Sequence, residues 1–204
     1  SGAVMTLVAI TMLRLFDPAR EEWRDAIDER WSAFLSHCGV LPLYMPNDVQ
    51  VSRNLLARLQ PQGVLLTGGG SCQALSGIAD PRDKTETMLL VWAEQHRLPV
   101  LGVCRGMQVM LSRVGAKLEP VASHIGSHTI RSHGAVRLVN SFHDYGFYVV
   151  PPGYVVEAVS ADGVIEAVSN FEASHSAVMW NPERNQPWNT ADISLIHTVF
   201  GVSP

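Results

Sequence analysis

The chain has 204 residues, 47% of them apolar and 17% charged, with a formal net charge of −4 and a mean hydropathy of +0.10. This composition is typical of a globular protein and excludes the disordered and fibrous classes. Because there is no Lys/Arg-rich run, the sequence gives no electrostatic basis for binding nucleic acid or an anionic membrane. No apolar stretch reaches the roughly 18 residues of a membrane-spanning helix.

Residues 1–4 precede the first methionine and have the character of a cloning remnant. We expect the other residues, 5–204, to form a single domain. The three cysteines, Cys38, Cys72 and Cys104, cannot all pair, and their spacing does not match a zinc site. The spacing of the histidines does not match a metal-binding helix either. We therefore expect no cofactor, no metal and a reducing, cytoplasmic setting.

Short apolar runs alternate with amphipathic segments along the first 115 residues. Such runs predict buried strands, and apolar residues at three- to four-residue steps predict helices. The predicted strands are 7–12, 41–45, 63–67 and 98–103, and the shorter predicted helices are 54–59, 84–96 and 106–114. A longer helix is predicted within residues 14–40, on the apolar spacing of Trp23, Ile27, Trp31, Phe34 and Cys38. The polar segment 71–83 predicts a loop.

This alternation predicts an α/β doubly wound fold, whose strands are continuous apolar runs because helices cover both faces of the sheet. After residue 120 the alternation of predicted strands and helices gives way to predicted strands separated by Gly/Pro/Asp turns. Further strands are predicted at 135–139, 147–150, 155–159, 164–168 and 177–180, and a helix over 192–200. We expect these strands to be antiparallel additions to the same sheet.

The fourth predicted strand runs into Gly102-Val103-Cys104-Arg105-Gly106 and a helix. This G-x-C-x-G pattern is the cysteine form of a nucleophile elbow, a strained turn that raises the reactive side chain above the sheet edge. The helix dipole and the adjacent Arg105 would lower the pKa of the Cys104 thiol. The alternative is a core cysteine between two structural glycines.

A second strand also ends in glycines, at Thr67-Gly68-Gly69-Gly70. Backbone N–H groups of such a loop can approach a ligand and stabilise a developing oxyanion. The alternative is an ordinary flexible turn.

Five motifs follow one another between residues 67 and 184: T-G-G-G, G-V-C-R-G-M-Q, V-N-S-F-H, D-G-V-I-E-A-V and W-N-P-E-R. Together they resemble the class I glutamine amidotransferases, the Cys-His-Glu family. The resemblance implies a flavodoxin-like fold with a mostly parallel sheet, and a nucleophilic Cys104. It implies an oxyanion hole formed by the backbone N–H groups of Gly69 and Arg105, and Glu183 as the residue that orients the base. It also implies substrate contacts at Gly70, Gln108, Ser141, Phe142, His143 and Arg184.

The sequence departs from the family at one catalytic position. The family's H-P-E is here Asn181-Pro182-Glu183, so an amide stands where the general base is expected. An asparagine side chain forms hydrogen bonds but cannot take a proton from Cys104 near neutral pH. Either the histidine was replaced in the laboratory, which the intact neighbouring motifs favour, or the protein is a natural pseudoenzyme.

The flanking segments RDAIDERW and PERNQPWNTADISLI carry a narrower resemblance, to the γ-glutamyl-CDP-amidate hydrolases of capsule phosphoramidate synthesis. It implies a small-molecule, nucleotide-linked partner that is cleaved to glutamate and cytidine diphosphoramidate. Phosphates would need cations, and the candidates are Arg14, Arg20, Arg24, Arg30 and Arg184. The alternative is that these arginines are ordinary solvated residues on helix faces. A glutaminase subunit feeding ammonia to a synthetase, a silent glutamyl-binding protein and a homodimer all stay open.

Overall fold

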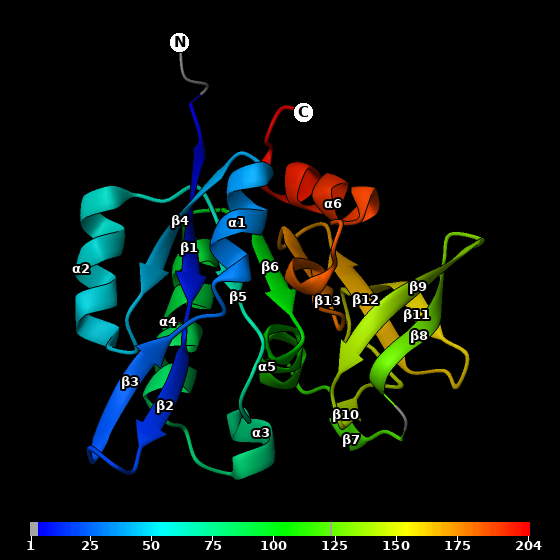
Figure 1. Ribbon diagram of the computed structural model, residues 1–204, viewed down its shortest axis with the longest axis horizontal. Helices are drawn as coiled ribbons and strands as arrows, with labels where there is room; N and C mark the ends of the chain where they lie inside the picture. Colours follow the sequence, from blue (N-terminus) through cyan, green and yellow to red (C-terminus); the bar gives the residue numbers. More distant parts are fainter. Residues whose placement is uncertain (1–3, 123) are drawn as a thin grey trace.

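The structure, a computed structural model, describes residues 4–122 and 124–204 (Figure 1). Residues 1–3 of the expected cloning remnant lie outside the described residues. The main feature is one nine-stranded sheet with the order β4-β1-β5-β6-β13-β12-β11-β8-β9. None of the helices among the described residues combines the length and apolar character needed to cross a bilayer.

The first five strands in that order are parallel, and their bounds are β4 Val40–Met45, β1 Thr6–Thr11, β5 Val64–Leu66, β6 Val100–Val103 and β13 His175–Val178. The other four are antiparallel, with bounds β12 Ile165–Asn170, β11 Val155–Ser160, β8 Ile125–Ser132 and β9 Ala135–Phe142. Strand β13 joins the two groups because it pairs with β6 in parallel and with β12 in antiparallel orientation.

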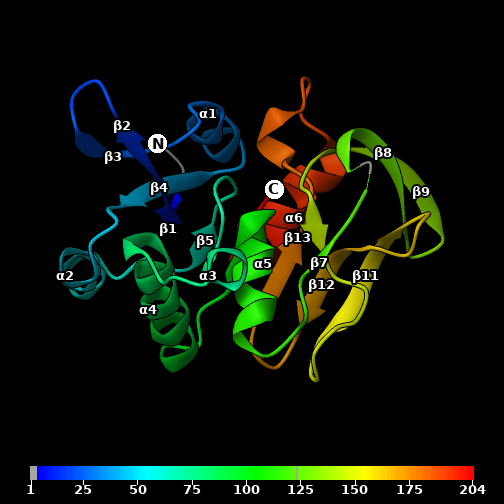
Figure 2. The same ribbon diagram turned by 90° about the horizontal axis from the view of Figure 1, so that it is seen from below.

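Helices cover both faces of the parallel strands (Figure 2), and the central strands β5 and β6 are wholly buried, whereas the edge strand β4 is partly exposed. One apolar layer includes residues of α2 Val49–Leu59, α4 Pro81–Gln95 and α5 Arg105–Arg113. The opposite layer includes residues of α1 Arg30–His37 and α6 Thr190–Phe200. The α/β class with a mostly parallel, helix-flanked central sheet and antiparallel C-terminal additions is therefore confirmed.

The long helix predicted within residues 14–40 is wrong for its first half. Residues Leu13–Asp17 (β2) and Glu22–Ala26 (β3) form an antiparallel hairpin, and only Arg30–His37 is helical. Pro18 interrupts the segment directly after β2, and Asn47 holds the hairpin by donating hydrogen bonds to Asp25 and to backbone carbonyls of β2 and its preceding residue. Tertiary contacts thus override a helical spacing.

The strand predicted at residues 147–150 is also wrong, because the chain there bends toward Pro151 after a two-residue strand β10, Tyr145–Gly146, which pairs with β7, Glu119–Pro120. Strand β8 was not predicted at all. Its side chains are mostly exposed, so no apolar run marks it. The predicted loop 71–83 holds one further helical turn, α3, Gln73–Ser76.

Candidate active site

The G-x-C-x-G segment forms a sharp turn between β6 and α5. Cys104 has φ 54° and ψ −109°, a conformation that side chains rarely adopt. A Cβ atom on Gly106 would lie 2.3 Å from the carbonyl oxygen of Leu66, and one on Gly102 would lie 2.4 Å from Met110 Sδ. The two glycines are therefore required for strand and helix to pass this closely around Cys104.

The glycine loop after β5 lies beside this turn. A Cβ atom on Gly68 would meet Cys104 Cβ at 3.2 Å and Asn181 Oδ1 at 3.3 Å, so Gly68 stands next to both side chains. Gly69 has φ +88° and lies against Leu13, the first residue of β2. The β2–β3 hairpin, which the sequence predicted to be helical, thus closes one side of the glycine loop.

Arg82, at the start of α4, fixes the orientation of the loop. Its guanidinium donates hydrogen bonds to the carbonyl oxygens of Thr67 at 2.9 Å, Gly68 at 3.3 Å and Gly69 at 2.6 Å. In a trans peptide the N–H points opposite to the carbonyl. The Gly69 N–H therefore points away from Arg82, as an oxyanion donor must. Sequence reasoning did not single out Arg82.

The side chain of Arg105 belongs to the same buried network. It donates to Glu86 at 2.6 Å and to Asp83 at 2.9 Å, and the same Glu86 oxygen accepts from Arg82 at 2.6 Å. The network ties the glycine loop to the first residue of α5, whose backbone N–H has no partner within the helix. The Glu86 and Asp83 carboxylates also neutralise the positive charge of Arg105, which was expected to lower the pKa of the Cys104 thiol.

The expected low pKa of Cys104 is wrong for this chain. Burial raises the pKa of the thiol to about 12, and the nearby Glu183 and Glu166 carboxylates act in the same direction against the backbone N–H of Arg105. At neutral pH the sulfur keeps its proton. A thiolate at this position needs a neighbouring base.

Asn181 and Glu183 follow β13 and border the elbow. Both are buried, and neither Asn181 Nδ2 nor Glu183 Oε2 has a hydrogen-bond partner among the described residues. Burial raises the pKa of Glu183 to about 7. Glu183 Oε2 is thus free to accept a hydrogen bond from an imidazole at position 181, as the acid of a Cys-His-Glu site does.

Asn140 positions Asn181, although sequence reasoning missed it. Its Oδ1 accepts from the backbone N–H of Asn181 at 2.9 Å, and its Nδ2 donates to the carbonyl oxygen of Asn181 at 2.8 Å and to Asn185 Oδ1 at 3.0 Å. The V-N-S-F-H motif contains it, so its signal lay in the asparagine before Ser141.

The sequence profile of the peptidase C26 family matches residues 6–137 and 120–183. The chain belongs to this family. It is 23% identical to the γ-glutamyl-CDP-amidate hydrolase of Campylobacter jejuni over 91% of this chain and 94% of that protein. It is 28% identical to a γ-glutamyl-γ-aminobutyrate hydrolase of Escherichia coli O157:H7 over 85% of this chain and 83% of that protein.

Solved glutamine amidotransferases share the fold of this C26 member. The crystal structure of such a protein from Thermotoga maritima superimposes with a TM-score of 0.67 at 14% identity, covering 97% of this chain and 84% of that one. At this identity the likeness concerns the fold alone. It confirms the flavodoxin-like class I amidotransferase architecture.

The remaining predicted substrate residues of this C26 member lie on several elements. Gln108 donates to the carbonyl oxygen of Tyr145 at 3.1 Å, and Ser141 is fully buried with its hydroxyl unpaired among the described residues. Phe142 is half exposed, and the Arg184 guanidinium lies 4.5 Å above its ring.

Two other predicted substrate residues face protein groups. His143 Nδ1 donates to the carbonyl oxygen of Tyr145 at 3.0 Å, and its Nε2 faces His124 and Glu166. Gly70, with φ +75°, borders Arg82. Their roles as substrate contacts stay predictions.

The candidate arginines divide by their partners. Arg24 pairs with Asp17 and Glu22, and Arg30 pairs with Asp28. Arg14 stacks on Trp23 with its guanidinium 3.6 Å from the ring centre, and Arg20 is exposed. With its guanidinium over Phe142, Arg184 is the arginine among these five that lines the cavity described next.

A cavity of about 60 Å³ lies at the site, and its lining includes Gly68, Gly69, Asn181, Glu183 and Arg184. The other lining residues are Leu13, Ile27, Asp28, Trp31 and Thr67.

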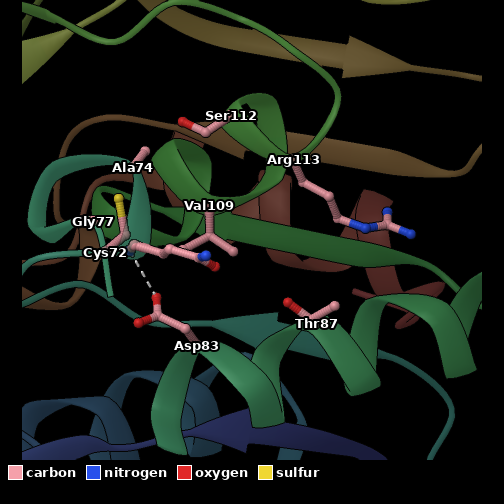
Figure 3. A pocket seen from close by; sticks show the side chains of 9 residues that line it. Cys72, Ala74, Gly77, Asp83, Thr87, Val109, Ser112 and Arg113 are labelled. Atoms are coloured by element: carbon pink, nitrogen blue, oxygen red, sulfur yellow. Dashed lines mark hydrogen bonds between the residues drawn. The ribbon is translucent and has the colours of Figure 1, made fainter. Parts of the chain in front are cut away.

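A larger cavity of about 500 Å³ lies between α3, α4 and α5 (Figure 3). There the Gln73 backbone N–H donates to Asp83 at 3.0 Å. No predicted site residue lines the larger cavity.

Proposed function

We propose that the Cys104 site hydrolyses a γ-glutamyl amide bond through a γ-glutamyl thioester, in the form of the protein that carries histidine at position 181. Membership of the peptidase C26 family and the γ-glutamyl hydrolases among its relatives support this class of reaction. The observation that carries the proposal is the Cys104 elbow beside the glycine loop and Asn181.

In the first half-reaction the imidazole at position 181 takes the Cys104 proton, and the thiolate attacks the γ-carbonyl carbon. The oxyanion of the tetrahedral intermediate accepts hydrogen bonds from the N–H groups of Gly69 and Arg105. The C–N bond then breaks, the imidazolium gives its proton to the leaving nitrogen, and a thioester remains on Cys104.

In the second half-reaction water attacks the thioester carbonyl while the imidazole takes one of its protons. The C–S bond breaks, glutamate leaves, and Cys104 recovers its proton. Glu183 accepts a hydrogen bond from the other ring nitrogen and keeps the imidazole in the required tautomer. Its burial and its unpaired Oε2 support this role.

The chain as it stands, with Asn181, should bind such a substrate and turn it over very slowly. Its thiol has a pKa of about 12, and an amide stands at position 181, where the imidazole would accept the proton. The unsatisfied Asn181 Nδ2 and Glu183 Oε2 support a site built for a different side chain at position 181.

For the substrate we propose γ-glutamyl-CDP-amidate, cleaved to glutamate and cytidine diphosphoramidate. The support is the match to the Campylobacter jejuni hydrolase over nearly the full length of both chains. Arg184 lines the cavity, and its positive charge supports a contact with an anionic leaving group.

The test is the Asn181→His variant, assayed for glutamate release from γ-glutamyl-CDP-amidate, γ-glutamyl-γ-aminobutyrate and glutamine. General acid–base catalysis contributes typically about 100- to 10,000-fold, so activity should rise at least about a hundredfold. Asn181→Gln is the matched control, because it adds length without a titratable group, and Cys104→Ser in the restored chain should abolish the gain.

Equal activity of the Asn and His forms would mean that another residue is the base. Tight binding of a γ-glutamyl compound without turnover by either form would instead establish a silent binding protein. Preference for glutamine, with ammonia release, would favour a glutaminase subunit.

A further inference from the structure

We propose that His124, His143 and Glu166 form a zinc site. This inference does not rest on the proposed function, since none of its groups is needed for proton transfer at Cys104. The three residues come from the segment before β8, from the turn after β9 and from β12. Only the antiparallel part of the sheet brings them together.

The distances between the ligand atoms match a zinc site. His124 Nδ1 lies 3.0 Å from Glu166 Oε1 and 3.3 Å from His143 Nε2. His143 Nε2 lies 3.6 Å from the same Glu166 oxygen. Tetrahedral zinc with bonds of about 2.0–2.1 Å holds its ligand atoms about 3.3–3.4 Å apart. The ligand atoms of His124, His143 and Glu166 therefore lie close enough together to share one ion.

Outer hydrogen bonds direct two imidazole lone pairs inward. His124 Nε2 lies 2.8 Å from Asp162 Oδ2, and His143 Nδ1 lies 3.0 Å from the carbonyl oxygen of Tyr145. Because a carboxylate and a carbonyl only accept, these two ring nitrogens carry the protons. The opposite nitrogens then face the centre as lone pairs, which is how outer-sphere carboxylates and carbonyls orient zinc-bound histidines.

The centre lacks a positive group. Glu166 is fully buried, and neither of its carboxylate oxygens has a hydrogen bond among the described residues, although His124 is at contact distance. His128 Nε2 is unpaired as well. Two lone pairs converging on a buried carboxylate repel one another unless a cation lies between them.

Burial and ligand chemistry favour a transition-metal site. His124 and His143 are 3% and 4% exposed. Imidazole and carboxylate ligands suit zinc, and three protein ligands leave the fourth tetrahedral position for a water molecule. A zinc ion here would join the segment before β8, the turn after β9 and β12 across the antiparallel strands.

The competing arrangement places an extra proton on the pair of imidazoles, which would leave a buried imidazolium beside Glu166 and no metal. The experiment that separates the two uses the full chain, stripped with a chelator and titrated with Zn²⁺ by calorimetry. We expect one equivalent to bind. Zinc at about a hundred times its Kd should raise Tm by roughly 5–10 °C, whereas an imidazolium–carboxylate pair gives neither effect.

Variants assign the ligands. Glu166→Gln keeps the shape of the side chain and should weaken zinc binding at least about a hundredfold. Asp162→Asn should weaken it about 10- to 100-fold, as loss of an orienting carboxylate does. Asp162 is 49% exposed, so that variant tests the site even where Glu166→Gln does not fold. His133→Ala, an exposed histidine of the same β-hairpin, is the matched control and should bind zinc unchanged.

Cys104→Ser must also retain the zinc, since a cysteine is the other strong ligand in this region. Loss of binding in that variant would move the metal to the active site and overturn the proposal. Absence of stoichiometric zinc binding, or equal affinity in the wild-type chain and Asp162→Asn, would overturn it as well.

Discussion

The two halves of the sheet bring chemical groups together in different ways. In the parallel half, β4-β1-β5-β6-β13, the site is built at strand ends from backbone geometry: the positive φ of Cys104, the glycine loop and the first turn of α5. In the antiparallel half, β12-β11-β8-β9, the histidine cluster is built from side chains on separate segments aligned by strand register. A site built from backbone geometry is marked by short motifs in the sequence. A site built from side chains on paired strands is marked only by residues scattered along the sequence.

Two buried charge clusters, one in each half, are compensated differently. Arg82, Asp83, Glu86 and Arg105 form a network in the parallel half, with ion pairs of 2.6–2.9 Å. Each of these four groups has a partner of opposite charge, although Glu86 Oε2 accepts no hydrogen bond among the described residues. In the antiparallel half neither oxygen of the buried Glu166 has a hydrogen bond among the described residues, and the site calls for an additional cation.

The largest stability effect should come from Glu86→Gln in the buried network. Removing one partner of a buried ion pair costs about 3–5 kcal/mol because the remaining charge is left uncompensated, and Glu86 serves two arginines. Glu157→Gln, in the exposed His133 pair of the antiparallel half, is the control and should cost less than about 1 kcal/mol. Urea unfolding of both variants measures the difference, and equal costs would contradict the contrast.

The next effect is a pH dependence of stability set by Glu183. Burial raises the pKa of this carboxyl from 4.5 to about 7, so the folded chain holds a proton that the unfolded chain has released. The contribution of protonated Glu183 to the free energy of unfolding is fully present below about pH 4.5 and is lost as the pH rises through about 7. The loss should reach up to about 3 kcal/mol.

Urea unfolding at intervals from pH 4.5 to 8, in parallel with Glu183→Gln, isolates this contribution, since the variant should lack it. Asn181→His should also flatten the decline, because an imidazolium beside Glu183 favours the carboxylate. A Glu183→Gln chain with the same pH profile as its parent would show that this carboxyl is ionised in the folded protein.

A third prediction concerns the reactivity of the cysteines. Burial raises the pKa of both Cys104 and Cys38 to about 12, so neither should react quickly with iodoacetamide in the native chain at neutral pH. Pairing with an imidazole lowers a thiol pKa to about 3.5–7.5. Asn181→His should therefore accelerate labelling of Cys104 at least about a hundredfold and leave Cys38 unchanged, as peptide mass mapping would reveal. Rapid labelling of Cys104 before the substitution would contradict the raised pKa.

The smallest of these effects compares the elbow glycine with a glycine of β10, which pairs with β7 outside the nine-stranded sheet. Gly106→Ala in the elbow meets the backbone oxygen of Leu66 at 2.3 Å and should cost about 1–3 kcal/mol, because backbone cannot move aside cheaply. Gly146→Ala in β10 meets only side-chain atoms, with Val164 Cγ1 nearest at 2.9 Å, and should cost less, since a side chain can shift by a few tenths of an ångström. Thermal unfolding decides the order, and a larger loss at Gly146 would contradict it.

Much of the parallel half was predictable because its signals are local. Buried strands such as β1 and β6 are continuous apolar runs, and the elbow needs glycines on both sides of Cys104 wherever it occurs. The β2–β3 hairpin was mistaken for helix because Trp23 and Ile27 continue the spacing of α1. That segment is decided by Pro18 and by hydrogen bonds from the distant Asn47.

The amino-acid sequence by itself determined the α/β alternation, the glycine-flanked turn at Cys104 and the amide at position 181, since each depends on residues that are neighbours in the chain. Only the tertiary structure decided that Arg105 pairs with Glu86 and Asp83, that Arg82 orients the glycine loop, and that His124 and His143 meet Glu166. The physical reason is that pKa values, ion pairs and metal sites depend on distances of a few ångströms. Between residues far apart in the chain, helix packing and strand register set those distances and sequence spacing does not.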